Sequence, residues 1–291
     1  MDGVLLLDKP VGMSSNDALQ KARRLFSAAK GGHTGTLDPL ASGLLPLCFG
    51  EATKFSADLL DADKTYEAEL QLGVETDSGD VDGQILATST VNVGRDDFLA
   101  VLPAFTGAIE QIPPMHSALK RDGRPLYELA RQGVTVERAP RPVVIHALEL
   151  LDFSGSVARI RVTCSKGTYI RVLAIDIGRA LGCGAHLIAL RRTQVADLQL
   201  RAAVSLAELV AIAEETDRLP LLAPVDALLQ GLPRVDLDPA AADRFSHGNP
   251  VALPAGLSGK LRVYAGERLL GLGEPGPGGR LWPKRLVQLA G

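Results

Sequence analysis

The sequence has few cysteines, no long apolar run and almost no net charge. Its three cysteines, Cys48, Cys164 and Cys183, are odd in number and widely spaced, which argues against a disulfide framework and favours a reducing compartment. No stretch approaches the ~20 apolar residues of a membrane-spanning helix, and the N-terminus shows neither the basic start nor the apolar region of a secretory signal. We therefore expect a cytoplasmic protein that does not bind a membrane.

The small net charge conceals an uneven distribution. Lys and Arg number 31 and Asp and Glu 34, so the net charge is −3. Residues 58–110 carry 2 basic and 12 acidic side chains, whereas residues 111–145 carry 6 basic and 3 acidic, and residues 152–201 carry 8 basic and 3 acidic. A basic middle beside an acidic segment is compatible with a phosphate-rich partner, and equally with separate solvated faces.

Composition and alternating patterns predict an α+β fold. Hydrophobic residues make up 46% and charged residues 22% of the chain, a composition that excludes a disordered protein. Residues 3–8 form an apolar run typical of a buried strand, and strict alternation predicts half-buried strands at residues 65–72 and 157–164. Because strands and helices alternate without regular βαβ spacing, we expect a mixed β-sheet.

Two helices are predicted from the spacing of apolar residues. They cover residues 18–26 and 170–181, where apolar side chains recur every three to four positions. Polar residues before each run can cap the helices. The candidate caps are Ser14, Ser15 and Asp17 for the first helix and Thr168 for the second.

Proline-rich segments indicate how the chain is divided. Residues 111–145 are rich in proline and basic residues, and we expect them to leave the core as a long insertion. A second boundary lies near residue 232, followed by a hairpin pattern at residues 261–272. We predict a catalytic domain over residues 1–231 and a small β-rich domain over residues 232–291.

A glycine-rich loop presents an aspartate. Residues 31–45 read GGHTGTLDPLASGLL, and the glycines and the Asp-Pro pair favour an irregular backbone that exposes Asp38. Asp38 is either a turn aspartate or a nucleophile or base. The loop lacks the Gly-Lys-Ser/Thr ending of a P-loop and the spacing of a dinucleotide fingerprint, so no nucleotide cofactor is expected.

The loop closely resembles the catalytic loop of the tRNA pseudouridine synthase B family. The match is carried by the eleven residues HTGTLDPLASG at 33–43, which are highly specific. Further segments agree in order and spacing, so the resemblance spans about residues 3–195, whereas residues 232–291 resemble a PUA-like RNA-binding module only loosely. These segments are LDKPVG (7–12), KTY (64–66), PPMHSA (113–118), KGTYIR (166–171) and GAHLIALRRT (184–193).

The resemblance implies the fold and the reaction. The fold is a mixed-sheet catalytic domain of pseudouridine synthase type with a thumb-like insertion at about residues 111–145. The reaction is the isomerisation of uridine to pseudouridine at position 55 in the T-loop of tRNA, for which the base must be flipped out. The resemblance implies neither a cofactor nor an obligatory protein partner, and we expect a monomer that binds the T-stem-loop.

The resemblance also implies the catalytic residues. Asp38 matches the family's catalytic aspartate, and a carboxylate can act as nucleophile or base without a metal. Attack on the base, attack on the sugar and removal of a sugar proton all stay open for it. Arg171 matches the arginine that pairs with this aspartate, and Tyr66 matches the aromatic residue that stacks on the target base.

Three further positions resemble base-binding residues of the family. His33 matches a histidine that fills the space left by the flipped uridine, while Tyr169 and Leu190 match residues of the base pocket. Without the resemblance, Tyr66, Tyr169 and Leu190 would be interpreted as core residues.

Basic side chains are expected to contact the RNA backbone, which gives affinity and salt dependence but no base identity. They lie in the insertion and near the site. These residues are Lys120, Arg121, Arg124, Arg131, Arg138, Arg141, Arg191 and Arg192.

A metal site is not expected. Cys183 and His186 lack the second pair of ligands that zinc needs. The acidic run at residues 77–83 lacks the carboxylates of a calcium loop at its first and twelfth positions, Ser78 and Ser89. We interpret this run as a polar turn.

Two other functions stay open. The chain could be an RNA-binding or tRNA-folding protein whose catalysis is incidental, a reading that the intact set of Asp38, Tyr66 and Arg171 disfavours. It could also be a glycosidase that uses Asp38 with Asp77 or Asp80, because glycosidases need two carboxylates at a defined distance.

Overall fold

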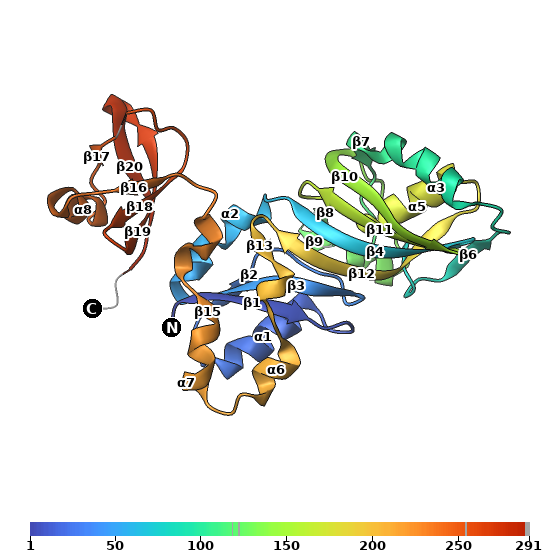
Figure 1. Cartoon of the computed structure of the whole chain (residues 1–291), viewed down its shortest axis with the longest axis horizontal. Helices are drawn as coiled ribbons and strands as arrows, with labels where there is room; N and C mark the ends of the chain where they lie inside the picture. The colour runs from blue at the N-terminus through green and yellow to red at the C-terminus, as the bar shows by residue number, and fades with distance from the viewer. Residues whose placement is uncertain (118, 122, 254, 289–291) are drawn as a thin grey trace.

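A large mixed sheet forms the body of the protein (Figure 1). The computed structural model describes residues 1–117, 119–121, 123–253 and 255–288. Most strand pairs are antiparallel, but β12 runs parallel to β3 and β14 parallel to β1, which confirms the predicted mixed sheet of an α+β fold. Along the sheet the strands are β14 (Val204–Ser205), β1 (Gly3–Lys9), β3 (Ala41–Phe49), β12 (Ala185–Val195), β4 (Lys64–Leu72), β11 (Val157–Cys164), β10 (Arg141–Ser154) and β7 (Gly107–Gln111), with β2 (Gly31–His33), β13 (Leu198–Gln199) and β15 (Leu222–Ala223) added at its sides.

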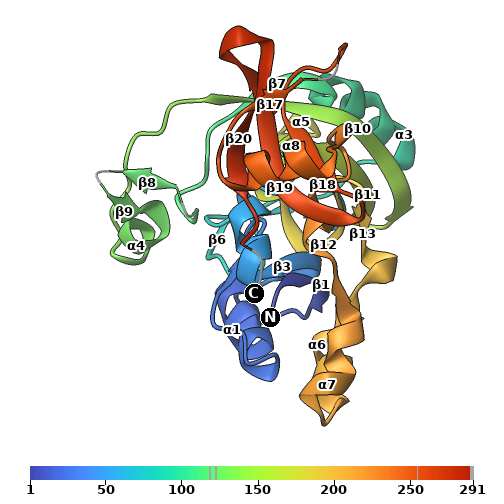
Figure 2. The same cartoon turned by 90° about the vertical axis from the view of Figure 1, so that its left-hand side faces the viewer.

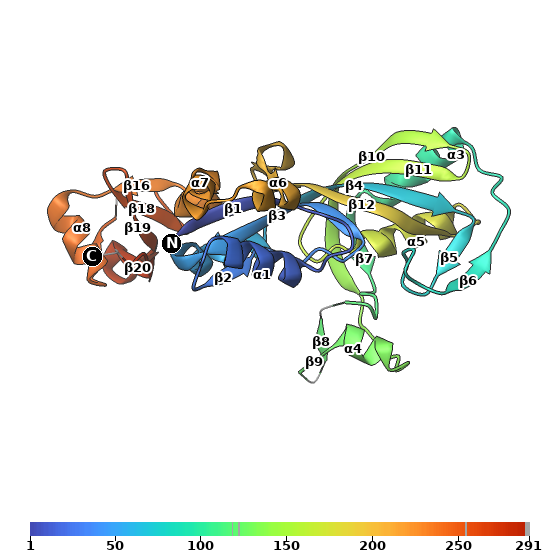
Figure 3. The same ribbon diagram turned by 90° about the horizontal axis from the view of Figure 1, so that it is seen from below.

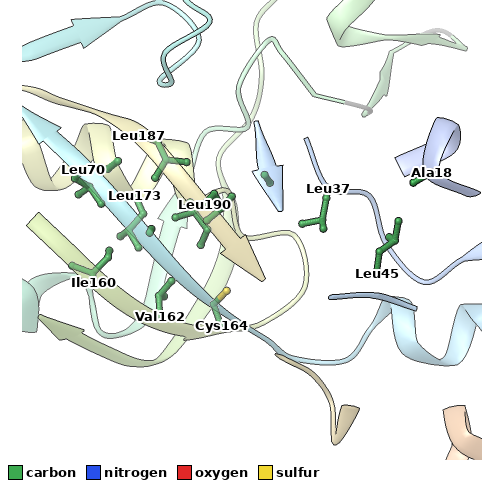
Figure 4. Close-up of a cluster of buried hydrophobic side chains, with 14 of the residues drawn as sticks. Ala18, Leu37, Leu45, Leu70, Ile160, Val162, Cys164, Leu173, Leu187 and Leu190 are labelled. Carbon is green, nitrogen blue, oxygen red and sulfur yellow. The ribbon is translucent and has the colours of Figure 1, made fainter. Parts of the chain in front are cut away.

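The alternating patterns place their apolar faces in the core as predicted. In β4 the side chains of Ala68, Leu70 and Leu72 are at most 1% exposed, and in β11 Ile160 and Val162 are fully buried. These residues meet one face of helix α5 (Ile170–Ala180) in a single cluster. Figure 4 shows several of them beside Leu173 of α5 and Leu187 and Leu190 of β12.

Eight helices and several single 3₁₀ turns surround the sheets in the described part of the chain. They are α1 (Ser15–Leu25), α2 (Ser56–Leu60), α3 (Arg95–Val101), α4 (Leu126–Arg131), α5 (Ile170–Ala180), α6 (Leu206–Ala211), α7 (Glu215–Arg218) and α8 (Pro239–Ser246), with 3₁₀ turns η1 (Gly50–Phe55), η2 (Leu102–Phe105), η3 (Leu200–Ala202), η4 (Leu219–Leu221), η5 (Val225–Leu229) and η6 (Pro277–Gly279). None of the helices in the described ranges combines the length and the apolar character that crossing a membrane requires.

One of the two predicted helix caps is correct. Ser14 is the N-cap of α1, and its Oγ accepts a hydrogen bond of 3.1 Å from the backbone N–H of Asp17. The prediction of Thr168 as the cap of α5 is wrong. Tyr169 occupies the N-cap position, one residue later than predicted, and the Thr168 hydroxyl donates to the carbonyl of Ser165 in the turn before the helix.

The insertion leaves the sheet at one pair of residues. Gln111 ends β7 and Arg141 begins β10, and these two residues are cross-strand partners. We define the insertion as residues 112–140, which project to one side of the sheet (Figure 3). The expected range of 111–145 was therefore too long, since residues 141–145 pair with β7. The insertion contains α4 and the paired strands β8 (Lys120–Arg121) and β9 (Arg124–Pro125).

A second sheet lies at the C-terminal end of the chain (Figures 1 and 2). Its hairpin of β18 (Leu261–Ala265) and β19 (Arg268–Gly276) confirms the prediction for residues 261–272. The remaining paired strands form a separate hairpin, β5 (Val74–Thr76) with β6 (Ile85–Thr88). The C-terminal sheet consists of β16 (Arg234–Asp236), β18 (Leu261–Ala265), β19 (Arg268–Gly276), β20 (Arg280–Leu286) and β17 (Val251–Ala252).

Candidate active site

The glycine-rich loop carries Asp38 between two short strands. The loop runs from β2, which ends at His33, to β3, which begins at Ala41. At Gly43 the backbone has φ +101°, and a Cβ there would lie 2.3 Å from the carbonyl oxygen of Arg192. Only glycine fits this close approach of β3 to β12. Asp38 itself is 41% exposed, so its carboxylate is available to a substrate.

Arg171 pairs with Asp38. Its Nε donates a hydrogen bond of 3.0 Å to Asp38 Oδ2, while its Nη1 and Nη2 donate to the carbonyls of Ser78 and His116 at 2.9 and 2.7 Å. The Arg171 side chain is 4% exposed. A guanidinium that is buried and held at three points has little freedom, so it can orient the Asp38 carboxylate.

Asp80 is a second carboxylate beside the same arginine. Its Oδ2 lies 3.5 Å from Arg171 Nε, and its side chain is 9% exposed. The hydroxyl of Ser78 donates to Asp80 Oδ1. The acidic run at residues 77–83 is therefore a turn, as predicted, but it also brings Asp80 to the site. The sequence shows the charge of this run and gives no signal of its burial.

A pocket of about 250 Å³ opens at Asp38. The structure brings together five of the six residues that the resemblance indicates. The pocket lining also includes Leu60, Lys64 and Ser117, to which the sequence analysis assigned no role. The five are Asp38, Tyr66, Tyr169, Arg171 and Leu190. Among the described residues His33 is not one that lines the pocket, and its Nδ1 accepts a long hydrogen bond from the N–H of Gly35.

Burial shifts the pKa of the two pocket tyrosines further from neutral pH. It raises the pKa of Tyr66 and of Tyr169 and outweighs the neighbouring arginines, which act in the opposite direction. Both phenols are therefore neutral at pH 7 and present uncharged rings to the pocket. Burial also lowers the pKa of His33, with Arg192 adding to the effect.

Three buried cations surround the pocket. Lys9, Lys64 and Arg192 are 0%, 7% and 1% exposed. Burial lowers the pKa of Lys9 to about 8, against the opposing effect of Asp38, and burial with Arg192 lowers that of Lys64 to about 8. Each donates to backbone carbonyls, as buried charges must. Their summed charge makes the surroundings of Asp38 positive.

Burial contradicts the predicted RNA contact of Arg192, whereas the prediction for Arg191 stays open. Arg192 donates to the carbonyls of Leu44 and Gly35 at 2.8 and 3.2 Å and is buried, so it is not free to bind phosphate. Arg191 faces the other way but pairs with Asp8 at 2.6 Å. Alternation along β12 turns consecutive arginines to opposite faces, which the run of two arginines by itself conceals.

The basic side chains of the insertion, and of Arg141 directly after it, are described only in part. Arg124 and Arg141 are exposed, and Arg138 is half-buried. Arg124 donates to Gln132 at 3.2 Å. The predictions for the side chains of Lys120, Arg121 and Arg131 fall outside what the structure describes.

The candidate metal ligands do not converge. The His186 ring hydrogen-bonds to the carbonyl of Val74 at 3.0 Å, and Cys183 is buried as a free thiol. Within the described residues, no group of three or more His, Cys, Asp or Glu side chains has the arrangement of a metal site.

The fold and the site define a class of RNA-modifying isomerases, the pseudouridine synthases. The structure superposes on that of a Cbf5–Nop10–Gar1 complex with a TM-score of 0.74 at 29% identity, over 94% of this chain and 78% of the other. It also superposes on an H/ACA ribonucleoprotein bound to a substrate RNA containing 2′-deoxyuridine, with a TM-score of 0.76 at 25% identity, over 99% and 85% of the two chains.

The chain belongs to the TruB family of pseudouridylate synthases. The model of the family's N-terminal domain matches residues 23–170, and models of its C-terminal domains match residues 171–230 and 233–287. The tRNA pseudouridine synthase B of Dechloromonas aromatica is 71% identical over 100% of this chain and 97% of its own length. That of Aromatoleum aromaticum is 60% identical over 99% and 93%. The chain is therefore an isomerase that converts uridine to pseudouridine in tRNA.

Proposed function

We propose that this enzyme modifies uridine 55 in the T-loop of tRNA and that Asp38 is its catalytic residue. The observation that carries the proposal is the 3.0 Å contact between the exposed Asp38 and the buried Arg171 at the mouth of the pocket. Asp80 shares Arg171 but is 9% exposed, so Asp38 is the better placed of the two to reach a substrate.

The pocket supports a flipped base. The isomerisation breaks the N1–C1′ bond, forms a C5–C1′ bond and moves a proton from C5 to N1. Tyr66 offers a neutral ring for stacking, and Leu190 and Tyr169 add apolar walls. Arg171 holds the Asp38 carboxylate towards this space. Attack on the base, attack on the sugar and removal of a sugar proton are all open to a carboxylate in this position.

The T-loop assignment fits the way proteins read RNA. Single-stranded loops whose bases are splayed out are the usual targets of specific recognition, and backbone contacts give affinity. We assign backbone contacts to the exposed Arg124 and Arg141, and a PUA-like RNA-binding role to residues 232–291 as a domain separate from residues 1–231. The enzyme would act as a monomer in the cytoplasm.

The test replaces the carboxylate of Asp38 by an amide. Asp38→Asn has neither the negative charge nor the basicity of the carboxylate, so we expect no turnover of a T-stem-loop RNA while binding persists. Asp152→Asn, an exposed aspartate of β10, is the matched control and should be fully active. Multiple turnovers by Asp38→Asn would contradict the proposal, and pseudouridine mapping shows which uridine reacts.

The two other candidate functions have less support. The glycosidase alternative is ruled out by family membership, and it would also require Asp80 or Asp77 to face the substrate, whereas Asp80 is buried. An RNA-folding role beside the catalysis would show as tRNA refolding by Asp38→Asn.

A further inference from the structure

A buried hydroxyl holds the loop next to Asp38. Ser15, at the start of α1, is 1% exposed. Its Oγ accepts a hydrogen bond of 2.8 Å from the N–H of Leu37 and donates one of 3.1 Å to the carbonyl of the same residue. Leu37 directly precedes Asp38. One hydroxyl thus satisfies both backbone groups of Leu37, and the loop is tied to a helix at the residue before the carboxylate.

A buried carboxamide holds the helix that carries Arg171. Gln111 is 2% exposed. Its Oε1 accepts a hydrogen bond of 2.9 Å from the N–H of Tyr169, and its Nε2 donates one of 3.2 Å to the Tyr169 carbonyl. Tyr169 is the N-cap of α5 and makes no capping bond with its own side chain in the structure as described. Gln111 therefore fixes where α5 begins, two residues before Arg171.

The same glutamine lies at the root of the insertion. Gln111 and Arg141 form the rung at which the insertion leaves and rejoins the sheet (Figure 3). The carbonyl of His116, five residues into the insertion, accepts from Arg171 Nη2 at 2.7 Å. The root of the insertion thus contacts the start of α5 at two points.

We propose that Ser15 and Gln111 are positioning residues for the isomerisation. Each binds both backbone polar groups of a residue close to one member of the Asp38–Arg171 pair, so together they set the 3.0 Å contact of that pair. Neither belongs to the described lining of the pocket, and both act through the backbone. The inference rests on the proposed role of Asp38. Displacement of a catalytic group by about 1 Å can lower a rate by about 100-fold.

The test compares two variants with matched controls. Ser15→Ala and Gln111→Met remove the bonds and nearly keep the volume. Ser14→Ala removes the neighbouring serine, which caps α1 without contacting the loop. Gln71→Met removes another glutamine that donates to a backbone carbonyl, at 2.9 Å, roughly 16 Å along β4 from Tyr66.

The readouts are the single-turnover rate at saturating enzyme and the Kd for a T-stem-loop RNA. We expect Ser15→Ala and Gln111→Met to lower the rate at least about tenfold with Kd changed less than about twofold, since chemistry and not binding depends on the pair. Both controls should keep the wild-type rate. Ser15→Thr retains the hydroxyl and should recover the rate, and Gln111→Glu, which cannot donate to the Tyr169 carbonyl, should not.

The double variant provides a second readout. Once one member of the pair is displaced, displacing the other adds little, so the combined loss in Ser15→Ala/Gln111→Met should be smaller than the product of the single losses. If Gln111→Met fails to fold, Gln111→Glu and Ser15→Ala carry the test.

Different experimental results would overturn the inference and the proposed function. Single-turnover rates of Ser15→Ala and Gln111→Met equal to those of the controls would overturn the inference, as would rate losses that match the loss of folded protein. Activity in Asp38→Asn would overturn the proposed function whatever the outcome for Ser15 and Gln111. An inactive Asp38→Asn with normal positioning variants leaves the proposed function standing and removes only the inference.

Discussion

Arg191 and Arg192 are neighbours in β12 but have different surroundings and different roles. Arg191 lies half-exposed and pairs with Asp8, whereas Arg192 is buried and binds two backbone carbonyls, one in the loop that carries Asp38 and one in β3. A buried charge is tolerated only when its hydrogen bonds are made. Arg192 is therefore a structural cation whose charge also acts on Lys9, Lys64 and His33.

Arg192→Ala should destabilise the protein without changing the salt dependence of RNA binding. The carbonyls of Leu44 and Gly35 lose their partner, which costs about 3 kcal/mol of the free energy of unfolding. A residue that contacts phosphate would instead lower the slope of log Kd against log salt by about 1. Urea denaturation and RNA binding at several salt concentrations measure both effects, with Arg124→Ala as the exposed comparison. A reduced slope in Arg192→Ala would restore its role as an RNA contact.

Lys64 should make the stability depend on pH. Burial, with Arg192 adding to it, lowers the pKa of Lys64 from 10.5 to about 8. Between these pH values the unfolded chain binds more protons than the folded chain, so the contribution of Lys64 to the free energy of unfolding rises with pH. Lys64→Met should remove this part of the slope in urea denaturation across that window. As a control, Lys284→Met replaces an exposed lysine and should keep the wild-type slope of unfolding free energy against pH. Equal slopes in wild type and Lys64→Met would contradict the lowered pKa of Lys64.

At the scale of elements, the ends of helices are set in two ways. Ser14 caps α1 with its own side chain, as local sequence predicts. The start of α5 is held by Gln111 from β7, far away in the chain. Local capping is visible in a sequence, whereas capping by a distant residue requires the strand and the helix to meet first.

Ser14→Ala should cost about 1 kcal/mol of the free energy of unfolding, the usual value for loss of an N-cap. Ser14→Gly should cost only a few tenths, because glycine tolerates the cap conformation. Activity per folded molecule should be unchanged for both, because the Ser14 side chain bonds only to Asp17 among the described contacts. Chemical denaturation measures the stability of both variants and a rate measurement their activity. A lower rate in a fully folded Ser14→Ala would link the cap to the loop that carries Asp38.

At the scale of the whole molecule, the C-terminal sheet rests on the segment before β4. Lys260 pairs with Asp58 of α2 at 2.6 Å, and Lys54 of η1 donates to the carbonyl of Leu286 at 3.0 Å. Leu272 of β19 is 2% exposed in a cluster that includes Val4 of β1. The C-terminal sheet is thus packed on the body of the enzyme through both apolar and charged contacts.

Removal of residues 232–291 should lower the melting temperature, since the partners of Leu272 become exposed. Binding of full-length tRNA should weaken modestly, and less at high salt. Isomerisation of a short T-stem-loop should continue, because every residue assigned to the chemistry lies between His33 and Leu190. The measurement compares both RNAs after circular dichroism confirms folding. A folded truncation that is inactive on both would show that the C-terminal part supports the active site.

The sequence alone determined the elements with strong local patterns. Alternation in β4 and β11, the spacing of α1 and α5, and the hairpin of β18 and β19 depend on neighbouring residues, whose preferences act before tertiary contacts form. The resemblance carried by the motif around Asp38 and by the other matching segments likewise indicated the family and five of the residues that line the pocket.

Only the tertiary structure decided which charged and polar residues are buried. Asp80, Arg192, Ser15 and Gln111 look like ordinary polar positions in the sequence, and each is at most 9% exposed in the fold. Burial and pairing depend on contacts between segments far apart in the chain, such as the 133 residues that separate Asp38 from Arg171. Sequence periodicity reports which face of an element is apolar, but the partner that a polar group meets is fixed only when those faces pack together.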